Sequence, residues 1–354
     1  MVQVPVVGRV GRPGLWGRLQ PARCSTHNPL PPRCYDRTVV AALYALICLI
    51  WGSTWLAIKI GLDGVPPFLA AGVRFVLAAA IVGVVLAVRG RRIALTRDDK
   101  ICILSLGVLI FWLDYACVYW AELYISSGLT AVLFSTMPLM TALLSAFWMG
   151  SETLTARKVA GILVGIAGTA LLFWPHERLG LMQSLGMIST LAGSLCAAIN
   201  LVMLKKHGAH SDPFVLNFFG MGLGAACLLL MSALFESWTT VVWTRSNVLA
   251  IVYLSVFGSV IAFSTYYFLI KHMDATIVSL STLVIPIVAL ALGRAVLHET
   301  VTRTAVLGIV TILAGVGVAI IPPAETKPTL EREAPEFTKA ISRSRSGTAA
   351  GRQP

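Results

Sequence analysis

One carboxylate of this sequence, Asp114, stands well inside an otherwise apolar stretch. A charged side chain at the centre of a membrane-spanning helix costs about 2.5–3.5 kcal/mol to insert, so its presence needs a reason. Small residues recur on its helical face, which predicts that Asp114 faces other helices rather than lipid. Three interpretations stay open: the carboxylate carries a proton, it contacts an amine substrate, or it is a structural partner of Lys59, Arg74 or nearby backbone.

A polar and aromatic stripe precedes it along the chain. Gly52, Trp55 and Lys59 are three and four residues apart, so they share one helical face. A similar spacing of small and polar residues recurs in the second half, at Gly193, Cys196 and Asn200. Two such matched faces are what a central cavity requires, with Trp rings as a cation–π or stacking wall. The alternative is that Lys59 extends to the outer interface and the Trp rings simply pack.

Hydroxyl groups complete the candidate set. Ser135 and Ser281 lie shortly before Pro138 and Pro286, which each remove a helical hydrogen bond and free a carbonyl. Hydroxyls at such points either line a cavity or donate a hydrogen bond to a free carbonyl of their own helix, and both interpretations are kept. The candidate substrate-binding residues are Trp51, Trp55, Lys59, Asp114, Tyr115, Tyr119, Ser135, Asn200, Tyr266 and Ser281.

Other unusual residues are expected to be structural. Arg74 has no basic counterpart in the second half and is interpreted as a topology anchor or ion-pair member. Glu152 and Glu299 are expected to cap the helices that follow them. The pattern Gly161-xxx-Gly165 is typical of close helix packing rather than of ligand binding.

The composition of the 354-residue chain places these residues in a membrane. Hydrophobic residues make up 57% and charged residues 12%, and the mean hydropathy is +0.81. A soluble domain is about 45–50% apolar and about 25% charged, so the class of ordinary soluble proteins is excluded. The seven cysteines are scattered and have neither metal-site nor disulfide spacing.

Apolar runs of about 20 residues, enough to cross a bilayer as a helix, occur ten times. We therefore predict an all-α integral membrane protein with ten transmembrane helices. Their approximate limits are 39–59, 68–88, 101–121, 127–149, 156–174, 184–204, 213–235, 247–268, 276–296 and 303–321. The polar segments 1–38 and 323–354 are expected to be disordered cytoplasmic tails, without a secretory signal.

Positive charge predicts the orientation. With the N-terminus in the cytoplasm, 22 of the 28 Lys and Arg residues fall on the cytoplasmic side. The outer loops then hold only Arg178, Arg245 and Arg303. Positive residues favour the cytoplasmic side, so both termini are expected inside.

The two halves of the chain resemble each other. When 151–175 is aligned with 298–322, nine of 25 positions are identical. We therefore predict repeats at 39–175 and 184–322 with five spans each. Because five is odd, the second repeat must be inverted in the membrane, which is typical of alternating-access transporters.

Several segments resemble the drug/metabolite transporter superfamily, in its ten-helix form with two EamA domains. They are WGSTWLAIKIGL (51–62), PPFLAAGVRF (66–75), the run 124–155, FGSVIAFSTYYFLIK (257–271), and MDATIVSLSTLVIPIVALALG (273–293) with HET (298–300). The resemblance covers about residues 39–322. It implies an inner-membrane carrier, usually an exporter of amino acids or other small metabolites, with a cavity built mainly from spans one, three, four, six, eight and nine. Arg294 and His298 depart from the family's usual pattern near the end of span nine.

The expected function is secondary active export of amino acids or related amines or drugs, coupled to protons or exchange. The expected partners are the lipid bilayer and a small-molecule substrate, with no cofactor, metal or nucleic acid. An intramembrane enzyme would need clustered carboxylates or histidines at one membrane face, and the sequence lacks them. A receptor or scaffold would need a folded soluble domain or a longer tail, which the sequence also lacks.

Overall fold

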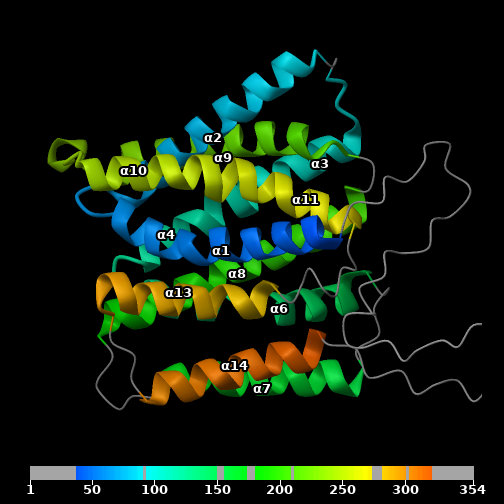
Figure 1. The fold of residues 1–354 in the computed structure, drawn as a ribbon, viewed down its shortest axis with the longest axis vertical. Coiled ribbons are helices and arrows are strands. Elements are labelled where there is room, and N and C mark those ends of the chain that lie inside the picture. The colour runs from blue at the N-terminus through cyan, green and yellow to red at the C-terminus, as the bar shows by residue number, and fades with distance from the viewer. Residues whose placement is uncertain are drawn as a thin grey trace, which may run out of the picture. The chain divides into compact units, whose positions relative to one another are not determined.

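The computed structural model describes residues 37–90, 93–149, 155–173, 180–208, 211–272, 281–299 and 303–320. Within these ranges every regular element is helical (Figure 1). The two predicted tails lie outside the described residues, except that the first helix already begins at Arg37.

The helices follow the apolar runs of the sequence closely. In chain order they are α1 (Arg37–Gly61), α2 (Pro67–Arg89), α3 (Arg97–Ser105), η2 (Leu106–Asp114), α4 (Tyr115–Ala121), α5 (Ser127–Phe134), α6 (Met137–Leu144), η3 (Ser145–Met149), α7 (Ala156–Phe173), α8 (Leu181–His207), α9 (Pro213–Phe235), η4 (Trp238–Thr240), α10 (Arg245–Tyr253), η5 (Leu254–Ile261), α11 (Ala262–His272), α13 (Ser281–Leu297) and α14 (Arg303–Ile320). Seven described segments are long and apolar enough to cross a membrane. They coincide with predicted spans one to four and six to eight, while the fifth, ninth and tenth correspond to α7, α13 and α14.

The third and eighth spans have the same local construction. Each begins with a capping box, in which Thr96 pairs with Asp99 and Thr244 with Asn247. Each then passes through a π-helical segment, η2 in the first half and η5 in the second. π-helical turns inside α-helices are rare and frequently mark functional sites, so their recurrence at matching places is a specific feature of the repeat.

Helices of one half pack mainly on helices of the other. α2 contacts α9 and α7 contacts α14, which are matching positions of the two repeats. α1 contacts α13, as α8 contacts α5 and α6 in the reciprocal arrangement. η2 of the first half packs on α9, and η5 of the second half packs on α2. The centre of the bundle is therefore built from both halves.

Glycines bring α7 and α14 unusually close together. A Cβ added to Gly315 would lie 2.5 Å from the backbone N of Gly165 and 2.7 Å from the carbonyl O of Gly161. Small residues let helix backbones approach in a membrane, where packing rather than water exclusion drives association. The packing role predicted for Gly161-xxx-Gly165 is confirmed, and Figure 1 shows the two helices side by side.

Two glutamates cap helices of the opposite half. Glu236 accepts hydrogen bonds from the backbone N–H groups of Phe68 (2.8 Å) and Leu69 (3.0 Å) at the start of α2. Glu299 accepts from the backbone N–H and hydroxyl of Ser127 at 2.8 and 2.9 Å, at the start of α5. A carboxylate is favourable there because helix N-termini carry unpaired N–H groups and partial positive charge.

The expectation that Glu299 caps the helix after it is therefore wrong. His298 adopts a left-handed backbone conformation (φ 53°). The backbone N–H of Glu299 donates to the carbonyl of Gly293 at 3.2 Å. This turn carries the carboxylate back to α5 of the first half instead of forward to α14. Glu152 lies outside the described residues.

Candidate functional site

A buried guanidinium lies between the two halves. Arg74 on α2 is 1% exposed. Its Nε donates to the Ser259 hydroxyl at 3.1 Å, and Nη1 and Nη2 donate to the hydroxyls of Tyr119 (3.2 Å) and Tyr115 (3.4 Å). Its Cζ also lies 4.8 Å from the Tyr115 ring centre and 5.1 Å from that of Phe75. We call Arg74, Tyr115, Tyr119 and Ser259 the arginine–hydroxyl cluster.

The elements around this cluster hold the guanidinium in place. The Ser255 hydroxyl on η5 donates to the carbonyl of Arg74 at 3.0 Å, which ties η5 to α2. Gly258 lies beside the guanidinium, where an added Cβ would be 3.3 Å from Nη2. Tyr115 and Tyr119 are one helical turn apart on α4, immediately after the π-helical η2. The π-helical segments η2 and η5 therefore both border the cluster.

Neither predicted role of Arg74 is found within the described part of the chain. No carboxylate there forms an ion pair with it, and its side chain is buried inside the bundle instead of exposed at the surface. Its bonding partners are neutral hydroxyls. Arg74 stands out in the sequence as a charge inside an apolar run. Because the second half has no basic counterpart, the sequence favours a structural role for it over a binding role.

Asp114 occupies the end of η2 and faces the bundle, as predicted. It is 4% exposed and packs against Gly193 of α8, where an added Cβ would lie 2.7 Å from Oδ1. Oδ1 has no hydrogen-bond partner among the described residues. No ion pair with Lys59 or Arg74 occurs in the same ranges. The structure thus places a buried carboxyl oxygen, without a donor, against the second half.

Lys59 ties the end of α1 to a neighbouring turn. Its Nζ donates to the main-chain carbonyls of Ile125, at 3.0 Å, and of Glu122. The side chain of Glu122 is fully buried, and neither of its carboxyl oxygens has a hydrogen-bond partner in the described chain. Sequence reasoning missed this glutamate, although a charge directly after an apolar span signals it. Gly52, on the same face as Lys59, packs against Val288, 2.5 Å from where its Cβ would be.

The aromatic candidates pack against other rings. Trp51 lies 5.2 Å from Tyr266 and 5.8 Å from Phe263, measured between ring centres. Trp55 is buried and lies 5.4 Å from the ring of Phe134. These geometries agree with the packing interpretation of the two Trp rings, while Trp51 and Tyr266 join α1 to α11 across the halves.

The remaining polar candidates are the buried residues Asn200, Ser135 and Ser281. Asn200 accepts at Oδ1 from the Ser105 hydroxyl at 2.9 Å. The Ser135 hydroxyl donates to the carbonyl of Val132 at 2.6 Å, so it re-satisfies its own helix. Ser281 begins α13 and is also buried. The structure brings Tyr115 and Tyr119 into the arginine–hydroxyl cluster but does not bring these three residues there.

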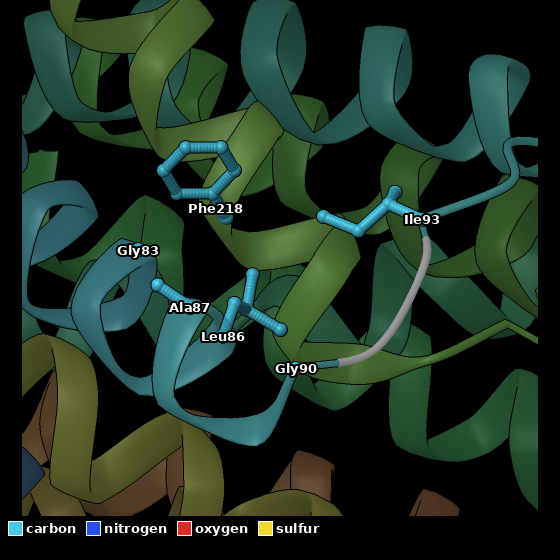
Figure 2. Close-up of a pocket in the computed structure, with 6 residues that line it drawn as sticks. All are labelled: Gly83, Leu86, Ala87, Gly90, Ile93 and Phe218. Carbon is cyan, nitrogen blue, oxygen red and sulfur yellow. The ribbon is translucent and has the colours of Figure 1, made fainter.

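A small hollow lies away from all of these residues, at the end of α2 (Figure 2). Its volume is about 230 Å³. It is lined by Gly83, Leu86, Ala87, Gly90, Ile93 and Phe218. This lining has no polar side chain, so we assign it no chemistry.

A helical bundle with repeated halves, membrane-length spans and buried polar groups between the halves defines the chain as a multi-pass membrane protein of the transporter class. A family model, the EamA-like transporter family, matches residues 39–174 and 184–321. The chain belongs to this family, which is consistent with the drug/metabolite transporter superfamily.

Similar proteins carry transporter names. An uncharacterized inner membrane transporter of Escherichia coli K12, YedA, is 32% identical over 270 residues, 74% of this chain and 84% of that protein. The uncharacterized transporter YoaV of Bacillus subtilis is 26% identical over 272 residues, 76% and 92% of the two chains. A solved crystal structure has a TM-score of 0.56 at 22% identity and covers 80% of this chain and 97% of its own, which shows the fold alone.

Proposed function

We propose that this protein is a secondary active transporter that exports small metabolites by alternating access between two inverted five-helix halves. The observation that carries the proposal is the arginine–hydroxyl cluster. It joins α2 and α4 of the first half to η5 of the second, and Arg74, Tyr119 and Ser259 are all buried. A solute reaches such a place only if the halves move apart on one side, which is the requirement of alternating access.

The substrates we propose are amino acids or related amines and drugs, and export is the expected direction. The excess of Lys and Arg on one side supports a topology with both termini in the cytoplasm. The five-span repeats that follow from the sequence would then be inverted relative to each other. The reciprocal contacts of η2 with α9 and of η5 with α2 support this arrangement.

Asp114 is the proposed proton-coupling group. Its buried Oδ1 has no donor within the described residues, so the side chain is available to take up a proton. Replacement Asp114→Asn should abolish proton-driven accumulation and leave exchange intact, because the amide keeps the shape but cannot titrate. The measurement is uptake with and without a pH gradient in proteoliposomes. Asp63→Asn, a change at an exposed carboxylate, is the matched control. Unchanged dependence on the gradient in the Asp114 variant would remove it from this role.

Counterflow tests transport itself. Proteoliposomes are loaded with unlabelled amino acids and biogenic amines and then diluted into trace amounts of each labelled compound. A carrier gives a transient accumulation of tracer, because it exchanges internal for external solute. Protein-free liposomes are the control. Absence of accumulation for every compound in the panel would contradict the proposed function.

A further inference from the structure

We propose that the arginine–hydroxyl cluster binds a carboxylate of the transported solute, with Arg74 as the anion-recognising residue. This inference rests on the proposed function and narrows its substrate class. It separates acids, such as amino acids and organic acids, from amines and neutral drugs that carry no carboxylate.

The first argument is the charge balance. Arginine is always charged in proteins, and a buried charge is normally paired with an opposite one. Arg74 has three hydroxyl partners at 3.1–3.4 Å and no carboxylate within ion-pair distance among the described residues, and the buried carboxyls of Asp114 and Glu122 interact with it only at longer range. Neutral hydroxyls at those distances solvate the guanidinium but do not neutralise it. An arriving carboxylate would therefore gain more interaction energy at Arg74 than at an arginine that is already paired with an acidic side chain.

The second argument is the supply of donors. A guanidinium has five N–H groups in a planar fork that matches the two oxygens of a carboxylate. Only three donations from Arg74 to side chains occur in the described structure. The hydroxyls of Tyr115 and Tyr119 accept from Arg74, so the proton of each phenol is free to point elsewhere. A carboxylate would meet a cation and two phenolic donors at one place.

The third argument is the position of the cluster. Tyr115 directly follows the π-helical η2, and Ser259 lies within the π-helical η5. π-helical turns are frequently found at functional sites because they displace side chains from regular helical positions. Here η2 and η5 both border the Arg74 guanidinium, and they come from opposite halves of the chain. A ligand at Arg74 would thus contact both halves and could favour one arrangement of them over another.

The test uses the purified full-length protein in detergent and matched acid–amide pairs as probes. L-Leucine with L-leucinamide, L-phenylalanine with L-phenylalaninamide, and succinate with succinamide differ chiefly at the carboxylate. We expect acids to raise the melting temperature of the wild-type protein and the amides to leave it unchanged. Arg74→Gln should weaken binding of the acid about 10- to 100-fold, the range for a hydrogen bond to a charged group. Arg74→Lys should retain part of it, because Lys keeps the charge but loses the fork.

Two further variants make the test independent of how well Arg74→Gln folds. Tyr115→Phe combined with Tyr119→Phe removes both phenolic donors and keeps the guanidinium, so acid binding should weaken while the acid preference persists. Arg89→Gln is the matched control, since Arg89 is an exposed arginine of the same helix whose guanidinium stacks 4.1 Å from the Phe214 ring centre. It should bind acids like the wild type.

Three results would overturn the inference: equal stabilisation by acid and amide, an acid preference that survives Arg74→Gln, or no stabilisation of the wild type by any acid. Counterflow distinguishes these failures from failure of the proposed function. A wild-type protein that exchanges amines or neutral compounds, and not acids, is still a transporter but does not use Arg74 for a carboxylate.

Discussion

Two half-buried glutamates at helix N-termini connect the two halves directly. Glu236 accepts two backbone N–H groups of α2, and Glu299 accepts the N–H and hydroxyl of Ser127 on α5. Both carboxylates come from the second half and both helices from the first. In the proposed topology these contacts lie at the outer end of the bundle.

Glu299→Gln should lower the free energy of unfolding by about 0.5–2 kcal/mol, the range for loss of a good N-cap, because the amide removes the negative charge from the start of α5. Thermal unfolding of the purified protein in detergent measures the change. Asp63→Asn, an exposed carboxylate that caps no helix, should leave the stability unchanged. Equal stability of the two variants would mean that the Glu299 contact contributes nothing.

At the scale of residues, the sequence predicted correctly the surroundings of a side chain where they depend on a single helix face. The small residues beside Asp114 correctly predicted that it faces the bundle. Prediction failed where a side chain crosses between halves. The direction of Glu299 depends on the turn at His298, and the partners of Arg74 come from α4 and η5. The hydrophobic periodicity of α2 carries no information about hydroxyl groups that lie 41 and 185 residues away in the sequence.

At the scale of elements, the contact of α7 with α14 is sensitive to side-chain size because backbone meets backbone there. Gly315→Ala would place a Cβ 2.5 Å from a backbone atom of Gly165, so the helices must separate. We expect a loss of about 1–3 kcal/mol of stability, the range for overpacking a close contact. Gly222→Ala on α9 is the matched control, since nothing lies within 4 Å of its added Cβ. Unfolding measurements in which both variants behave alike would contradict the close packing.

Apolar runs predicted the positions of the helices because a bilayer leaves few alternatives to a helix. The starts of α2 and α9 follow from Pro67 and Pro213, which fit the first turn of a helix. The π-helical segments were not predicted. Their residues are as apolar as the α-helical ones around them, and the helices they pack on, α9 and α2, belong to the opposite half of the chain.

At the scale of the whole molecule, alternating access requires a central site that is reached from each side of the membrane in turn. The repeated sequence and the shared cluster support such a site. A channel would leave the cluster open to both sides at once, and a receptor would open it to one side only. The proposed topology also fixes which surface residues lie on which side.

The most direct measurement is labelling of a cysteine placed at Ser259, in a variant whose seven native cysteines are replaced by alanine and which retains counterflow. Membrane-impermeant maleimide is added to right-side-out and to inside-out vesicles. Asp63→Cys should react only from outside, and Lys206→Cys only from the cytoplasmic side, because both positions are exposed at opposite ends of the proposed topology. Ser259→Cys should react from both sides, with transported solute shifting the balance between them. Labelling of Ser259→Cys from one side only, or from neither, would contradict alternating access through this site.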